Sequence, residues 1–331
     1  MNLSTLLETK ADDATNLPAF RIKLVKVKEA VRDILSQWRS NGFYREYTDH
    51  TIVHVDGMLN LAEWIIPQET KEAMTPADWL LLTLSIYFHD LGMLITKDEF
   101  NNRSKNKDFQ KYLESPLIDD RKFSEYKAAL AELEEVEADR LRYEEYVRAN
   151  HGRRVRSWIE GSRIDDGDVS EQIRAILTPL IEDLNPTFVK DLAKVCESHT
   201  HDALDDQKLF PVSQPYGSDQ ETANVQYVAL VLRTVDLLHI RDRTPSIVYQ
   251  LINPSDPYSQ IEWSKQQRVR SVRAKPARNK DGDIDDSVQS ETIEVHAEFD
   301  DPDGFFGLTS SAICGGSTTA IPLYCEKIRE R

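Results

Sequence analysis

The stretch LLLTLSIYFHDLGMLI, Leu80–Ile95, is the most apolar window of the chain, and it carries His89 and Asp90 side by side near its end. A window this apolar predicts a core helix. A buried charge that lacks a partner costs several kcal/mol, so buried ionic groups are usually paired or bound to a metal. Other parts of the chain must therefore bring partners to the end of this helix.

Apolar residues recur at helical spacing through about the first 240 residues, which predicts a mostly α-helical fold. In the segment 75–95, Thr75 is suited to cap the helix, Pro76 to its first position and Asp78 to its positive end. Gly92 is suited to end or kink this helix. Helices are expected over 20–38, 51–66, 75–95, 171–184, 187–199 and 221–240.

The segment 97–148 is charge-dense with thin apolar spacing, which predicts a solvated helix that acts as an insertion or lid. After residue 244 the pattern changes, because 267–274 and 291–299 alternate and contain β-branched residues, as strands do. The expected architecture is a helical bundle with a helical insertion at about 97–148 and a small C-terminal β-hairpin. The expected divisions are an N-terminal helical segment (1–42), the bundle domain (43–245) and a C-terminal α+β appendage (246–331).

Charge and composition exclude some partners. Lys and Arg total 41 whereas Asp and Glu total 57, a formal charge of −16. General binding to nucleic-acid backbones needs clustered Lys and Arg, so we do not expect it here. The longest near-continuous apolar run, Trp79–Phe88, is about half the roughly 20 residues that span a bilayer. Cys196, Cys314 and Cys325 show no paired spacing, which favours a cytoplasmic protein without disulfides or membrane contact.

The eight histidines gather mainly around the apolar helices. A single core histidine is usually only hydrogen-bonded, and Asp236 alone would more simply pair with Arg233 on its own helix. Several such groups beside apolar stripes, however, predict a metal site. Neutral imidazole and carboxylate suit one or two ions of Mn, Fe, Zn, Ni or Co, with Mg as a further candidate. His239 and His296 are expected to be solvated or locally hydrogen-bonded.

Five motifs contain the residues of this pattern: DHTIVHVDGML, LSIYFHDLGM, VRANHGRRVRSWI, VCESHTHD and LVLRTVDLLHIRDRTP. As a set they resemble the HD-domain phosphohydrolase superfamily over residues 43 to 245. The resemblance is closest to the HD domains of prokaryotic conflict and anti-phage systems. Those domains are often encoded with, or fused to, an ATPase of the heat-shock chaperone type. The 60 residues between Asp90 and His151 exceed the gap in compact HD domains, so the insertion is a candidate to reshape the pocket.

The resemblance implies a site whose metal ligands are His54, His89, Asp90, His151, His199 and Asp236. In a two-metal member Asp90 bridges the ions, His151 and His199 hold the second ion, and His201 competes for the place of His199. The implied catalytic residues are Asp90 together with His50 or His201, either of which would protonate the leaving oxygen.

Two neighbouring ions activate a water and stabilise charge on phosphoryl oxygens, so the implied reaction is hydrolysis of phosphoester or phosphoanhydride bonds. Arginines beside the ligands are candidates to bind phosphate, although a surface ion pair is an equal alternative for each. They are Arg153, Arg154, Arg241 and Arg243.

No Gly-rich phosphate loop is present. The negative net charge of the chain favours a nucleotide as the substrate. The seven basic residues of 265–280 would instead suit a single-stranded nucleic acid, and their alternative is a solvated hairpin that binds no strand.

Two alternatives stay open. A few HD-fold proteins hold two irons and oxidise a small polyol, so a di-iron oxygenase is one of them. The other is a nucleotide-sensing or regulatory module without turnover, against which six intact ligand positions count. The expected partners are a nucleotide or single-stranded nucleic acid and, by the defence association, an ATPase-type protein. The oligomeric state is left open.

Overall fold

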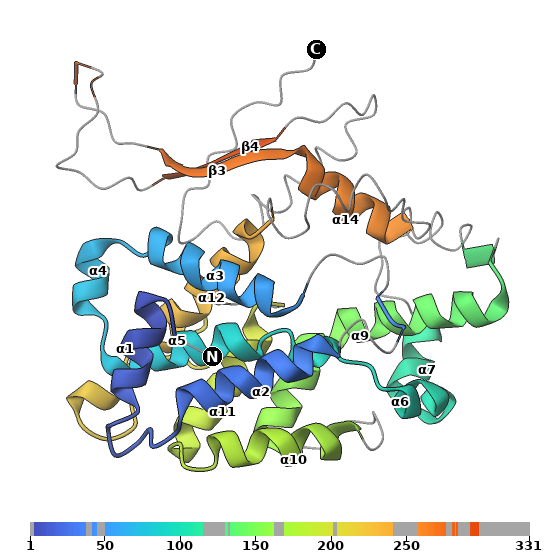
Figure 1. The fold of residues 1–331 in the computed structure, drawn as a ribbon, viewed down its shortest axis with the longest axis horizontal. Helices are drawn as coiled ribbons and strands as arrows, with labels where there is room; N and C mark the ends of the chain where they lie inside the picture. Colours follow the sequence, from blue (N-terminus) through green and yellow to red (C-terminus); the bar gives the residue numbers. More distant parts are fainter. Residues whose placement is uncertain are drawn as a thin grey trace.

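The computed structural model describes residues 3–37, 42–44, 50–114, 130–131, 133–161, 169–200, 204–240, 257–275, 280–281, 283 and 292–297. Helices dominate these residues, as the sequence predicts (Figure 1). The α-helices are α1 Leu6–Ala14, α2 Leu24–Ser36, α3 Ile52–Ile65, α4 Gln68–Ala73, α5 Pro76–Phe88, α6 Lys97–Asn101, α7 Lys107–Glu114, α9 Glu135–Glu160, α10 Val169–Ile181, α11 Pro186–Ser198, α12 Val225–Leu238 and α14 Pro257–Arg268. The shorter elements are the 3-10 helices η1 Leu91–Met93, η2 Arg103–Lys105 and η3 Asp219–Glu221, and the strands β1 Gln214–Pro215, β2 Thr222–Ala223, β3 Val269–Lys275 and β4 Thr292–Ala297.

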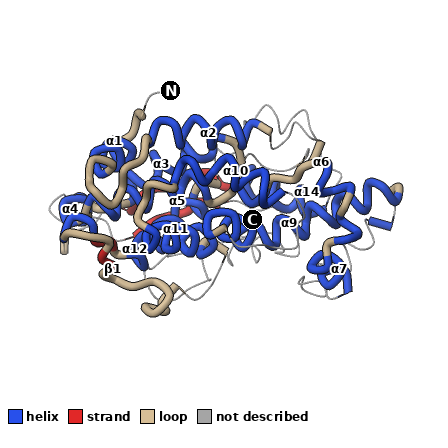
Figure 2. The backbone as a smooth tube through the Cα atoms, turned by 90° about the horizontal axis from the view of Figure 1, so that it is seen from below, coloured by secondary structure: helices blue, strands red, loops and turns tan. Residues whose placement is uncertain are grey.

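The apolar window forms α5, the central helix, which contacts α1, α2, α3, α11 and α12. Figure 2 shows α5 in the middle, with α1 and α2 on one side and α11 and α12 on the other. Every residue from Ala77 to Phe88 is buried, as a helix apolar on all sides requires. The predicted start of this helix is confirmed, because Thr75 and Asp78 cap it reciprocally and Pro76 is its first residue.

A buried polar network ties α3 to the N-terminal helices, of which α1 was not expected from the sequence. Lys28 on α2 lies 2.6 Å from Glu8 of α1 and 2.9 Å from Asp56 of α3. The hydroxyl of Tyr87 on α5 donates to Glu8 at 2.6 Å. Because an unpaired buried charge is costly, this network fixes α1, α2, α3 and α5 relative to one another.

The expectation of a solvated helix in the charged segment is wrong for residues 143–147 of α9. Tyr143, Tyr146 and Val147 are buried there and pack with Phe109 of α7 in a second, largely aromatic cluster. The charged side chains between them are also satisfied, since Glu144 accepts from the backbone N–H of Tyr44 at 3.0 Å. A segment with thin apolar spacing thus contributes to a small second core beside the main one. The helix α9 also continues past the predicted end of the insertion at residue 148.

The C-terminal alternation forms the antiparallel pair β3–β4, which Figure 1 shows with α14 to one side of the helical body. Its backbone register sets Val272 opposite Val295 and Arg273 opposite Glu294. A second antiparallel pair, β1–β2, is only two residues long and was not predicted. The domain boundaries at residues 42 and 245 stay predictions.

The segment Pro76–Asn101 is long and apolar enough to cross a membrane by length and composition alone. However, 94% of its most apolar window is buried inside the fold. This is the pattern of a core helix, in agreement with the place of α5 among its neighbours.

Candidate metal centre

Side chains from five helices converge just after the end of α5. They are His54 in the first turn of α3, His89 and Asp90 directly after α5, His151 within α9, His199 directly after α11, and Asp236 in the last turn of α12. The convergence follows from the packing, because α3, α11 and α12 contact α5 while α9 contacts η1, the segment that follows Asp90.

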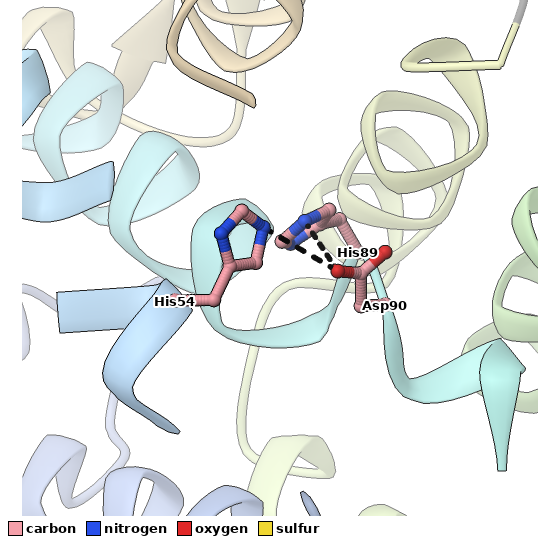
Figure 3. A group of neighbouring side chains, drawn as sticks. All are labelled: His54, His89 and Asp90. Atoms are coloured by element: carbon pink, nitrogen blue, oxygen red, sulfur yellow. Dashed lines mark ion pairs between the residues drawn. The ribbon is translucent and has the colours of Figure 1, made fainter. Parts of the chain in front are cut away.

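A first group consists of His54, His89 and Asp90, whose ligand atoms all lie within 4.8 Å of one another (Figure 3). Asp90 Oδ2 is 3.5 Å from His54 Nε2 and 3.1 Å from His89 Nε2. Asp236 Oδ1 lies 3.3 Å from His54 Nε2 and 3.9 Å from His89 Nε2. Two imidazoles and two carboxylates therefore face one point.

A second group consists of Asp90, His151 and His199, again with ligand atoms within 4.8 Å of one another. His151 Nε2 lies 2.6 Å from His199 Nε2 and 3.7 Å from Asp90 Oδ1. The two oxygens of Asp90 thus face different groups, Oδ2 toward the first and Oδ1 toward the second.

Backbone carbonyls determine which nitrogen of three histidines faces this cluster. The Nδ1 atoms of His89, His151 and His199 each donate to the carbonyl three residues earlier in the chain, at 2.9 Å for His89 and 2.5 Å for His151. A carbonyl oxygen only accepts, so each Nδ1 carries a proton. When neutral, each of these rings offers a lone pair at Nε2, the atom that faces the carboxylates.

Two observations indicate that the cluster suits a cation. The Nε2 atoms of His151 and His199 are 2.6 Å apart, and two lone pairs at that distance repel unless a proton is shared between them or a nearby cation offsets the repulsion. His89 Nε2 is buried and makes no hydrogen bond among the described residues, although Asp90 Oδ2 is 3.1 Å away. These groups could hold a divalent metal ion, and their donors suit several transition metals.

The electrostatics favour the cation-binding forms of Asp90, His151 and His199, but not of His89. Burial opposes ionisation of Asp90, but the charges of His89 and His50 outweigh it and hold the pKa of Asp90 well below its usual range. Burial lowers the pKa of His151. Burial, with His151 next to it, lowers the pKa of His199 to about 3. The pKa of His89 is raised because the charge of Asp90 outweighs burial. His151 and His199 are therefore neutral at pH 7 and Asp90 is ionised.

Arg154, predicted to bind substrate, is buried and directs its guanidinium into the protein. It donates to the carbonyls of Gly92 and Leu94, each at 2.8 Å, and lies 2.6 Å from Glu99. These contacts occupy its donors and hold the segment that follows Asp90. Arg154 thus holds the segment that follows Asp90 through interior contacts, and these disfavour the predicted binding of a phosphate.

Of the other predicted residues, His50 is buried with its ring 5.8 Å from that of His54, beside the first group. Arg153 is exposed and lies 2.9 Å from Asp108, the surface ion pair that was the alternative. Three predicted residues lie outside the described part of the chain: His201, Arg241 and Arg243.

Sequence reasoning missed the place of His239. Its Nδ1 lies 2.8 Å from Nδ1 of His54, on the edge of that ring opposite the carboxylates. A signal existed, because His239 follows Asp236 by three residues and the two share a helix face. Its partner, however, is 185 positions away in the sequence, and no local pattern reports such a contact.

The family model of HD-CE matches residues 44–304 of this chain. The match includes all of the histidines and aspartates of both groups. No curated protein and no solved structure matches the chain.

Proposed function

This chain belongs to the HD-CE family, and from its histidine–aspartate cluster we propose that it is a metal-dependent phosphohydrolase. The proposed reaction is hydrolysis of phosphoester or phosphoanhydride bonds in nucleotides or nucleic acid. The observation that carries the proposal is the placing of Asp90, whose two oxygens face two separate histidine groups. A carboxylate in that position is suited to bridge two ions.

The chain's residues would divide the work as follows. His54, His89 and Asp236 would hold one ion with Asp90 Oδ2, and His151 and His199 would hold a second with Asp90 Oδ1. Such ions, when bound, activate a water and offset the charge that develops on phosphoryl oxygens.

His50 is the described residue best placed to move a proton near this site. It is buried, and its ring is tilted against that of His54 at 5.8 Å. A histidine there would protonate the leaving oxygen of the substrate, a role for which His201 is the second candidate.

The acidic balance of the chain supports a nucleotide as the substrate rather than a long polymer, because a net charge of −16 repels an extended polyanion. The rival surface is the hairpin β3–β4, which carries Arg270 and Arg273 on β3. The backbone register sets Arg273 opposite Glu294.

A role in prokaryotic defence, with an ATPase-type partner, is also part of the proposal. It is supported only by the motif resemblance to HD domains of conflict systems, and it is independent of the chemistry. Co-purification of an ATPase with the tagged chain from its host would test the partner separately.

The decisive experiment measures hydrolysis by the metal-stripped chain after Mn²⁺ is added back. Rates are compared on a nucleoside triphosphate and a single-stranded oligonucleotide at two salt concentrations. The variants are Asp90→Ala, the triple neutralisation of Arg268, Arg270 and Arg273, and the control Asp183→Ala, an exposed carboxylate.

We expect Asp90→Ala to lose nearly all activity on both substrates and Asp183→Ala to keep it. The triple variant should weaken only the oligonucleotide reaction, in a salt-dependent way, if the hairpin binds a strand. Full activity of Asp90→Ala would contradict the proposal. A mixed-valent di-iron signal in spin resonance, without phosphate release, would favour the oxygenase alternative.

A further inference from the structure

His54 differs from the other histidines of the cluster in how its second nitrogen is held. The Nδ1 atoms of His89, His151 and His199 donate to backbone carbonyls. The Nδ1 of His54 instead faces the side chain of His239, at 2.8 Å. A backbone carbonyl is present whatever the side chains are, whereas this contact depends on one residue of another helix.

The end of α12 and the residue that follows it contact the His54 ring on both edges. Asp236 Oδ1 lies 3.3 Å from Nε2, and three residues later His239 lies 2.8 Å from Nδ1. The rings of His54 and His239 have centroids 4.9 Å apart and are tilted by 41°. The imidazole of His54 is thus held between a carboxylate and a second imidazole from the same turn.

A glycine on α3 makes room for this contact. Gly57 follows His54 by three residues, so the two share a face of α3. A Cβ added to Gly57 would lie 2.1 Å from His239 Nε2 and 2.7 Å from its Cε1. Any residue other than glycine at this position would therefore push the ring of His239 away from His54.

Two facing Nδ1 atoms can form a hydrogen bond only if one carries the proton. If His54 Nε2 binds a metal, its Nδ1 must carry that proton, and His239 Nδ1 must accept it. We propose that His239 is a positioning residue: it accepts the Nδ1 proton of His54 and so fixes the tautomer and orientation in which His54 binds the first metal. This inference rests on the proposed function, in which His54 is a ligand.

The test measures Mn²⁺ affinity of the metal-stripped chain by calorimetric titration, without any substrate. His239→Ala removes the acceptor, and His239→Asn restores one, because an Asn amide oxygen takes the place of Nδ1. Gly57→Ala displaces the ring and leaves His239 in the sequence. The double variant Gly57→Ala/His239→Ala completes a double-mutant cycle. The control is His296→Ala, which removes an exposed histidine.

We expect His239→Ala and Gly57→Ala each to weaken binding of the first ion by roughly 10- to 100-fold, the range found when the hydrogen-bond partner of a ligand is lost. The double variant should be no weaker than His239→Ala, because no ring remains to be displaced. His239→Asn and His296→Ala should stay close to wild type. The urea midpoint of the metal-free chain should not fall in His239→Ala, which separates positioning from a general loss of structure.

Unchanged Mn²⁺ affinity in His239→Ala and Gly57→Ala, with binding by the wild type, would overturn the role of His239 and leave the proposed function standing. Additive losses in the double variant would also overturn it. If His239→Asn were as weak as His239→Ala, a role as acceptor would be rejected. A wild type that binds no Mn²⁺, Zn²⁺ or Fe²⁺ would overturn both proposals together.

Discussion

A histidine that binds a cation through one ring nitrogen needs its other nitrogen protonated and held. At the residue scale, three histidines of this cluster meet that need with the carbonyl of the residue three positions earlier. The same burial that holds them also keeps His151 and His199 uncharged, since it lowers both pKa values. These two rings therefore offer neutral Nε2 atoms to the cation of the proposed site.

This arrangement predicts that the metal-free chain becomes less stable as the pH falls from about 6.5 toward 3. An unfolded chain protonates His199 near the ordinary histidine pKa of about 6.5. The folded chain does not do so until its pKa of about 3. Between those values the unfolded state holds more protons, so stability falls by roughly 1 kcal/mol per pH unit for such a histidine and is fully present above pH 6.5. His151 acts in the same direction.

Urea unfolding of the chelator-treated chain at pH 4 to 7.5 would measure this slope. His199→Ala should make the slope shallower, and His296→Ala should leave it unchanged. His89 has a raised pKa, so its contribution is lost only as the pH rises above about 6.5 and does not mask the effect. Parallel curves for wild type and His199→Ala would contradict the prediction.

The sequence drew attention to His89 and Asp90 because such a pair inside an apolar helix is costly without partners, and the family resemblance implied the other residues of the cluster. It did not distinguish Arg154 from Arg153, which stand side by side in one basic run. Helical phase would have done so, because Arg154 follows buried Val147 by seven residues and precedes buried Trp158 by four. His239 was beyond reach, since its role depends on a contact between two helices.

At the scale of the elements, glycines determine how closely the ligand-bearing segments approach. A Cβ on Gly92, in η1, would lie 2.0 Å from the backbone oxygen of His151 in α9. One on Gly152 would lie 2.7 Å from the Oγ1 of Thr200, just after α11. The sequence marked Gly92 as an end or kink of the core helix. In the structure, the missing side chain of Gly92 allows η1 to pack closely on α9, which brings Asp90 near His151. This role depends on the packing of the two segments and is not visible in the sequence.

We therefore predict that Gly92→Ala weakens metal binding at the proposed second group, Asp90, His151 and His199, more than at the first group. The clash is with a backbone atom, so η1 and α9 must separate, which moves Asp90 away from His151 and His199. His54 and His89 lie on α3 and at the end of α5 and are less affected. Such overpacking should also cost about 1–3 kcal/mol of unfolding free energy. Elemental analysis after dialysis should show fewer ions per chain than wild type.

The matched control is Gly217→Ala, where a Cβ would lie 2.2 Å from the Glu221 carboxylate, near β1. That variant should lose stability but keep the wild-type metal content. If Gly92→Ala also keeps the full content with unchanged affinity, the close approach of η1 and α9 is not needed for the second group.

At the scale of the whole molecule, the fold has its own large core around α5, and the two histidine–aspartate groups lie just after the end of that helix. Unlike a small zinc domain, such a chain should fold without metal. The fold class was accessible from the sequence because helical periodicity is a strong signal over long segments. The aromatic cluster of α7 and α9 was not, since its residues come from segments whose apolar spacing is thin and it forms only when they pack together.

The last prediction separates specific metal binding from the general attraction of cations to an acidic chain. With 57 Asp and Glu residues and a net charge of −16, Mn²⁺ will associate weakly with many surface carboxylates. Binding to the folded site alone adds RT ln(1 + [M]/Kd) to the unfolding free energy, about 3 kcal/mol when the metal is at 100 times Kd. For a chain of this size that corresponds to a rise in Tm of a few degrees.

Asp90→Asn keeps the shape of the side chain but removes the charge that faces both groups, so the rise should vanish in that variant. It should persist in Asp183→Asn, which removes one exposed carboxylate. Thermal unfolding followed by circular dichroism, with chelator and then with Mn²⁺, gives both values. The quantity compared is the increment on adding metal, because the metal-free Tm of Asp90→Asn also reflects the loss of its pairing with His89. An equal increment in Asp90→Asn and wild type would place the bound cations on the acidic surface and away from this cluster.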